Sequence, residues 1–414
     1  MESIIKNRQY YKFCFYGFLK NLRFFDAFLI LFLIEKGLSF TQIGILYATR
    51  EIVINLVEIP SGIIADTFGR KNSLATSLII YISSFIIFYL FGSFGWFMLA
   101  FILYGVADAF RTGTHKGIIM DYLKYQGWEE SKIDYYGHTR SWSQKGSAIS
   151  ALVAGLIVFY SGNYQNIFLY SVIPYLINFI LIISYPNNLN KSSREQNSKN
   201  LSQVWVTVKS LFKIIKQPNV FSIINSSALH TAYLQAVKDY IQPLMVSVAL
   251  IIPVLLNIEP ERKNGIIIGV IYFVIYLATS YASKISGKVA ARSNFNISYI
   301  TLLFGFLFGI ATGTFFILGI WTVSLVAFIG IYLIENIRKP ILTGLVSDSV
   351  PNEILTSVIS AQSQLKTILT ATIAFGFGFL ADKFGIGISF VTVSSLLIII
   401  SAGIYFYNFK RRLK

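Results

Sequence analysis

Long apolar stretches follow one another along this chain from about residue 10 to about residue 407. Most are near the ~20 residues that an α-helix needs to cross a hydrocarbon core of ~30 Å. Composition agrees, since hydrophobic residues make up 55% of the 414 residues and charged residues only 13%. A soluble chain of this length would carry more charge on its domain surfaces. The sequence therefore predicts an all-α membrane protein that crosses the bilayer many times.

We predict twelve transmembrane helices, at about 10–35, 42–66, 73–93, 96–122, 138–160, 165–185, 219–248, 264–289, 297–318, 320–346, 355–381 and 386–408. One long polar segment divides them six and six. The expected organisation is an N-terminal six-helix bundle at 1–186, a linker at 187–218 that includes a candidate surface helix, and a C-terminal six-helix bundle at 219–414.

Positive charge predicts the orientation of these helices. Cytoplasmic segments of membrane proteins are rich in lysine and arginine. The linker carries six such residues, and Lys6, Arg8, Arg70, Lys71 and the final "KRRLK" agree with it. We therefore expect both termini in the cytoplasm of a bacterium, with the protein in the inner membrane and its first span retained. The net charge of +16 is explained in this way, and no nucleic-acid partner is expected.

The two halves resemble each other. "IGILYATREIVINLVEIPSG" (Ile43–Gly62) aligns without gaps on "IGVIYFVIYLATSYASKISG" (Ile268–Gly287), and "DAFR" (Asp108–Arg111) corresponds to "ENIR" (Glu335–Arg338). Lys145 corresponds in the same way to Lys366. Parallel repeats of six helices are typical of transporters with a central binding site at the repeat interface.

The segment "GIIADTFGRKN", which begins at Gly62, resembles the loop 2–3 signature of the major facilitator superfamily (MFS), G-x-x-x-D-x-x-G-R-(K/R). The resemblance implies two pseudo-symmetric six-helix bundles and rocker-switch alternating access. Gly62 and Gly69 would allow close helix contact and a tight turn, while Asp66 and Arg70 would form charge-assisted bonds that latch one conformation. The second-half equivalent, "GKVAARSNFN", has Ala291 where the aspartate would be.

A bacterial subgroup of the superfamily looks similar in "EIPSGIIADTFGRK" and "RTGTHKGIIMDYL". That resemblance implies drug or cation export. However, His115 and Lys116 stand where acidic residues are usual in the subgroup. This departure weakens the inference of drug or cation export.

Charged side chains within membrane helices are rare unless they face water, a ligand or a partner. Asp108–Arg111 and Glu335–Arg338, each spaced three apart, can partly neutralise themselves, as can Arg23 with Asp26. Arg111, Lys145, Arg338 and Lys366 form a candidate cluster for an anionic or zwitterionic solute; a purely structural network is the alternative. The full set of candidate substrate-binding residues is Arg23, Arg111, Lys145, His230, Lys238, Arg338, Lys366, Trp142 and Gln144.

Coupling to an ion gradient needs a group whose proton affinity changes between states. Burial and a nearby cation act on a carboxyl group in opposite directions, which makes such a group tunable. The candidates are Asp26, Glu58, Asp108 and Glu335. Exchange of one anion for another would need no protonation and stays open.

We therefore predict a secondary active transporter for a small organic anion, such as a carboxylate, a phosphate ester or a siderophore-like compound, with proton coupling. The alternatives are a proton-antiport multidrug or metabolite exporter, and a non-transporting receptor or lipid flippase on the same fold. No ATP-binding P-loop occurs, and the three histidines have no metal-site spacing. We expect a monomer that is not an enzyme, with no cofactor or metal; its partners are the solute, protons or a counter-ion, and the lipid bilayer.

Overall fold

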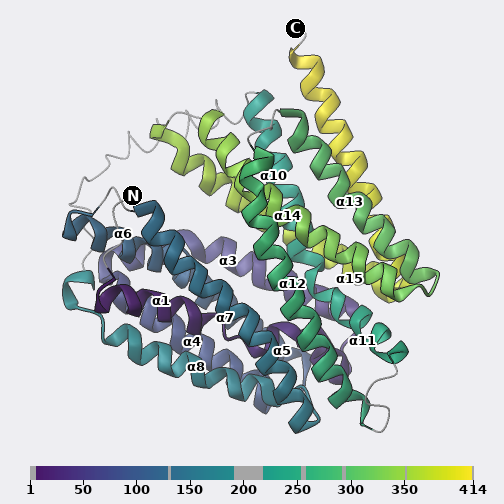
Figure 1. The fold of residues 1–414 in the computed structure, drawn as a ribbon, viewed down its shortest axis with the longest axis horizontal. Coiled ribbons are helices and arrows are strands. Elements are labelled where there is room, and N and C mark those ends of the chain that lie inside the picture. Colours follow the sequence, from purple (N-terminus) through teal and green to yellow (C-terminus); the bar gives the residue numbers. More distant parts are fainter. Residues whose placement is uncertain are drawn as a thin grey trace. The chain divides into compact units, whose positions relative to one another are not determined.

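The computed structural model describes residues 6–128, 132–190, 218–252, 258–290, 295–349 and 352–412. These ranges contain helices and short connections (Figure 1). Every one of the twelve predicted spans falls on helix. Seven spans match single helices: α3 (Phe40–Phe68), α4 (Arg70–Leu90), α7 (Lys132–Ser161), α8 (Asn166–Ile183), α12 (Pro260–Ala290), α13 (Phe295–Ile317) and α14 (Trp321–Ser349). Among the described residues, seven helical stretches are long and apolar enough to cross a membrane.

Three of the predicted spans are each divided into two helices. The first consists of α1 (Arg8–Lys20), a 3₁₀ turn (Phe24–Ala27) and α2 (Leu29–Glu35). The fourth consists of α5 (Phe94–Arg111) and α6 (Thr114–Gln126), which are separated by Gly113 with φ +79°. The seventh consists of α10 (Pro218–Val237), a 3₁₀ turn (Lys238–Tyr240) and α11 (Ile241–Ile251).

Charged residues lie at each of these breaks. Arg23 and Asp26 lie at the first, Arg111 at the second, and Lys238 at the third. Interrupted membrane helices free backbone groups and are typical of the binding region of transporters.

The last two predicted spans form α15 (Asn352–Arg412), which has one non-helical residue within it. Its direction changes at Gly385, which has φ +85° and ψ +161°. Glycine adopts this backbone conformation without the steric cost that a side chain would bring. The turn between the two spans therefore needs only one residue.

The chain forms two compact units. Unit 1 comprises Met1–Leu38, Thr49–Gln196 and Ile252–Tyr276, and unit 2 comprises Ser39–Ala48, Asn197–Ile251 and Leu277–Lys414. Most of the linker predicted at 187–218, with its candidate surface helix, lies outside the described residues.

The two units repeat one packing pattern. In unit 1, α1 packs against α7, and α4 packs against α5 and α8. In unit 2, α10 packs against α15, and α13 packs against α14 and α15. Counted as spans within each half, the first span packs against the fifth, and the third span packs against the fourth and the sixth. The sequence repeat is therefore a structural repeat, and the prediction of an all-α fold with two pseudo-symmetric helical bundles is confirmed.

Aromatic side chains fill the core of unit 1. Phe88 stacks on Phe168 at 4.7 Å between ring centroids, and Phe25 stacks on the same ring at 5.5 Å. Dispersion between such rings supplies packing energy in a bilayer, where burial gains little because lipid is equally apolar. This packed core holds the charged segments between the helices.

Candidate functional site

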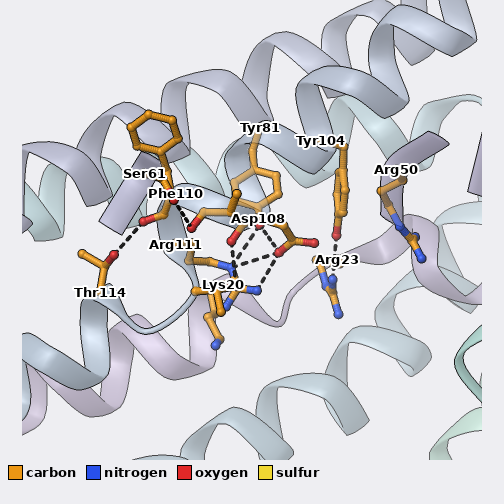
Figure 2. A network of polar contacts seen from close by, with 12 residues as sticks. Lys20, Arg23, Arg50, Ser61, Tyr81, Tyr104, Asp108, Phe110, Arg111 and Thr114 are labelled. Carbon is orange, nitrogen blue, oxygen red and sulfur yellow. Dashed lines mark hydrogen bonds and ion pairs between the residues drawn. The ribbon is translucent and has the colours of Figure 1, made fainter. Parts of the chain in front are cut away.

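A network of polar contacts joins the breaks of unit 1 (Figure 2). Asp108 accepts hydrogen bonds from Tyr81 Oη and from Arg111, whose Nη2 lies 2.6 Å from Oδ1. Arg111 Nε also donates to Tyr81 Oη at 3.0 Å. The predicted pairing of Asp108 with Arg111 is therefore confirmed, and the tyrosine hydroxyl completes it.

A second ion pair lies at the first break. Arg23 Nη2 is 2.9 Å from Asp26 Oδ2, and Arg23 Nη1 donates to Tyr104 Oη at 2.6 Å. Tyr104 packs edge-on against Tyr81 with centroids 5.0 Å apart, which links the two pairs. The expected pairing of Arg23 with Asp26 is confirmed.

Lys20 ends α1 beside this network and was not among the sequence candidates. It lies within electrostatic range of Arg111 and Arg23, and Figure 2 shows its side chain below Arg111. Within the described part of the chain Lys20 forms no ion pair, while its ammonium lies 5.9 Å from the Tyr16 ring centroid. It was missed because the first span was expected to be one helix, so nothing in the sequence indicated that a helix ends at Lys20.

Arg70 of the predicted latch segment forms an ion pair with α6. Arg70 Nη1 lies 2.7 Å from Asp121 Oδ2 on α6, with 15% and 20% of the two side chains exposed. Gly69 has φ +100°, so the turn needs glycine, whereas a Cβ on Gly62 would meet open space. The Asp66 side chain lies outside what the structure describes, as does the segment around Ala291. Glu58 is half-buried on α3, one turn before Gly62.

In unit 2 the direct partners of Glu335 and Arg338 lie on other helices. Glu335 Oε2 lies 2.6 Å from His230 Nδ1, and Glu335 Oε1 accepts from Thr231 Oγ1 at 2.5 Å. Arg338 instead donates to the Ser298 carbonyl, to Thr301 Oγ1 and to the carbonyl and hydroxyl of Ser226. Glu335 and Arg338 thus interact electrostatically, as expected for residues three apart, but their direct hydrogen-bond partners lie on α10 and α13.

Arg338 ties three helices together. Only 1% of this residue is exposed, and its bonds reach α10 and α13 from α14. Burying a guanidinium costs less when its donors are satisfied. The contacts above satisfy both terminal nitrogens of Arg338, while Nε has no partner among the described residues. The observed contacts make it a structural centre of unit 2.

A cavity of about 280 Å³ lies beside the Glu335 network within unit 2. Residues of α10, α14 and α15 line it, among them two lysines, Lys339 and Lys366. The other lining residues are Ser227, Ala228, Thr231, Gln235, Thr343, Val346, Ile359, Gln362 and Ser363. Thr231 joins the two features, because it lines the cavity and donates to Glu335. Of the predicted binding residues, Lys366 lies on this cavity; Lys339 was missed, although it follows Arg338 directly in "ENIRKP".

The other predicted binding residues lie elsewhere. Lys145 is exposed on α7, with its ammonium 5.3 Å from the Trp142 ring centroid, and Gln144 is exposed beside it. Lys238 is half-buried in the 3₁₀ turn after α10. Arg111 and Lys145 belong to unit 1, and Arg338 and Lys366 to unit 2. The four-residue cluster as a whole therefore stays a prediction. No group of three or more His, Cys, Asp or Glu side chains that could hold a metal occurs among the described residues.

Two repeated helical units, charged side chains at helix breaks and a polar cavity define the architecture of a membrane transporter. The sequence model of the Major Facilitator Superfamily matches residues 18–374. The chain belongs to this superfamily, as its loop signature indicated, and is an integral membrane protein.

Individual relatives are distant. The uncharacterized MFS-type transporter YxaM of Bacillus subtilis (strain 168) is 25% identical over 388 residues, covering 91% of this chain and 89% of that protein. The nucleoside transporter NupG has a TM-score of 0.75 and 12% identity, covering 98% of this chain and 100% of that chain. A POT family transporter in complex with 5-aminolevulinic acid has a TM-score of 0.71 and 13% identity, covering 97% of this chain and 96% of that chain. At such identities the structural likeness shows the fold alone.

Proposed function

We propose that this protein is a secondary active transporter that moves a small organic anion across the bacterial inner membrane by alternating access. The observation that carries the proposal is the cavity of unit 2, which two lysines line. Thr343 on the helix of Lys339, and Gln362 and Ser363 on the helix of Lys366, add polar groups to the lining.

Lys366 supports an anionic rather than a cationic solute. Among the described residues no carboxylate forms an ion pair with it, and it is half-buried. An ammonium in an apolar environment is costly unless water or an anion meets it. An anion that enters the cavity would supply the missing charge, while a lipophilic cation would meet two like charges.

The Glu335–His230 pair supports coupling to protons. A carboxylate with a neutral imidazole has a charge of −1, and one added proton makes the pair neutral. The charged groups that act on Glu335 are His230 from α10 and Arg338 from its own helix, and Thr231, which donates to this carboxylate, also lines the cavity that contains Lys339 and Lys366. Proton uptake would make this region more positive and strengthen anion binding; by reciprocity, a bound anion would raise proton affinity. Charges a few ångströms apart near a protein surface interact by about 1–4 kcal/mol, which corresponds to a change in affinity of about fivefold or more. The proposal is therefore symport of proton and anion.

The remaining expectations complete the proposal. A monomer with both termini in the cytoplasm would bind solute, protons and lipid, and would need no metal or cofactor. The Arg70–Asp121 contact would take part in the conformational latch, with Asp66.

The test measures binding and transport by the purified protein. Thermal stability is recorded with carboxylates, phosphate esters and lipophilic cations, because a ligand that binds only the folded state raises the melting temperature. Counterflow of any stabilising anion is then measured in proteoliposomes. Lys366→Gln should abolish both effects. Lys383→Gln is the matched control, because Lys383 lies on the same helix but contacts the Phe379 ring away from the cavity. Stabilisation by lipophilic cations alone, with no anion effect, would refute the proposal.

A further inference from the structure

The cavity of unit 2 is built from one face of each of three helices. Ser227, Thr231 and Gln235 repeat every four residues on α10. On α14 the lining residues are spaced by four and then three: Lys339, Thr343 and Val346. On α15 they are Ile359, Gln362, Ser363 and Lys366, which share one face of the helix. Residues three or four apart lie on the same side of a helix. The lining residues therefore follow one face of each helix, and polar side chains occur on all three.

Several of these polar groups keep hydrogen-bonding capacity. Gln362 Nε2 donates to Ser227 Oγ, which leaves the hydroxyl proton of Ser227 and the carbonyl oxygen of Gln362 for other partners. Within the described residues, the structure gives neither of these groups a further partner, and the Ser363 hydroxyl has none either. Each lies within one helical turn of Lys366, or opposite it across the cavity.

The lining also excludes one kind of ligand contact. Aromatic residues make up 16% of the chain, but none of the eleven described residues that line the cavity is aromatic. Flat aromatic ligands gain affinity from stacking on aromatic rings. This cavity offers hydroxyl, amide and ammonium groups in their place.

On the basis of the proposed anion transport, we propose that the substrate is a hydroxylated organic anion: a carboxylate or phosphate ester with hydroxyl groups near the charged end. The anionic group binds Lys366 and Lys339. The adjacent hydroxyls donate to the Gln362 carbonyl oxygen and accept from Ser227 and Ser363. A hydroxyl group has both a donor and acceptors, so it can satisfy amide and hydroxyl partners together.

The experiment compares matched solutes by thermal stability and competition binding. Gluconate and glycerol 3-phosphate are the hydroxylated carboxylate and phosphate ester. Hexanoate and propyl phosphate carry the same charged groups without hydroxyls, and sorbitol carries the hydroxyls without charge. We expect tighter binding of at least one hydroxylated anion than of its plain counterpart by about tenfold or more, since each neutral hydrogen bond contributes about threefold to tenfold. Sorbitol should not bind measurably.

Two variants make the test specific to the assigned residues. Gln362→Leu and Ser363→Ala should each reduce the preference for the hydroxylated anion about threefold to tenfold, while plain anions still bind. Thr372→Val is the control, because Thr372 is an exposed residue of α15 that bonds only within its own helix. Equal affinity for hydroxylated and plain anions, or an unchanged preference in both variants, would overturn this substrate class and leave anion transport standing. Failure of every anion to bind would remove both proposals.

Discussion

Glu335 on α14 and His230 on α10 meet with 2.6 Å between Oε2 and Nδ1, and one residue along, Thr231 connects the same carboxylate to the cavity. His230 is fully buried, and its Nε2 atom has no hydrogen-bond partner in the described part of the chain. The carboxylate thus lies between a titratable ring and a hydroxyl that a solute can reach. Protonation and solute binding would act on the same few atoms.

The first prediction is that Glu335→Gln uncouples transport from the proton gradient. The amide keeps the shape of the side chain but cannot take up a proton, so a pH difference should no longer drive accumulation of the anion in proteoliposomes. Counterflow at equal pH should continue, because it needs no net proton movement. Glu261→Gln, at an exposed position of α12, is the control. Accumulation by the Glu335→Gln protein at the normal level would rule out this carboxylate as the coupling group.

The second prediction separates the structural arginine from the binding lysines. Arg338→Lys removes the planar fork that reaches Ser298, Thr301 and Ser226 together. We expect a loss of folding free energy on the order of 3 kcal/mol, because several bonds to a buried charge are broken. The melting temperature in detergent should fall by several degrees, with Arg140→Lys at an exposed site as control. An unchanged melting temperature with lost anion binding would instead return Arg338 to the binding site.

Local sequence patterns predicted the helices, but only some of the contacts between charged residues. The apolar runs predicted the helices because each run must span the same bilayer thickness. Spacing of three correctly paired Asp108 with Arg111. For Glu335 it missed the direct partner His230, which is 105 residues away. Such a contact depends on helix packing, which no single stretch of sequence records.

The helix breaks were missed for a related reason. Gly113 permits a positive φ, but glycine is common within membrane helices and alone does not predict an interruption. The break after α1 contains no glycine or proline between Lys20 and Phe28. Its position follows from the Arg23–Asp26 pair and the aromatic packing around Phe25, which are properties of the folded unit.

The third prediction concerns Arg70 and Asp121. Their ion pair is partly buried, and Gly117 leaves the space that the Arg70 guanidinium occupies, because a Cβ there would overlap it. In a double-mutant cycle with Arg70→Gln and Asp121→Asn we expect a coupling energy of about 1 kcal/mol in stability. Each single variant should also change the rate of transport without changing solute preference. Additive effects of the two substitutions would show that the pair contributes nothing to the latch.

The fourth prediction tests the cation that the sequence did not indicate. Asp108 already accepts from Tyr81 and Arg111, so the ammonium of Lys20 beside it remains without an ion-pair partner among the described residues. If the cations Lys20, Arg23 and Arg111 attract the anion, Lys20→Gln should weaken solute affinity by about tenfold, because one charge near the anion is lost. Affinity is measured by competition binding at two salt concentrations, with Lys124→Gln at an exposed site as control. An affinity equal to that of the unaltered protein would confine anion recognition to unit 2.

The fifth prediction uses two glycines of α13 that face different residues of α10. A Cβ on Gly305 would overlap the His230 ring, whereas a Cβ on Gly309 would overlap the Tyr233 hydroxyl and Ser394 Oγ. Both Gly305→Ala and Gly309→Ala should therefore lower the melting temperature, since overpacking costs about 1–3 kcal/mol. Only Gly305→Ala displaces His230 from Glu335, so it alone should alter the pH dependence of anion uptake. The same pH profile in both variants would show that the position of the imidazole is unimportant for coupling, and that Glu335, if it carries the proton, does so without His230.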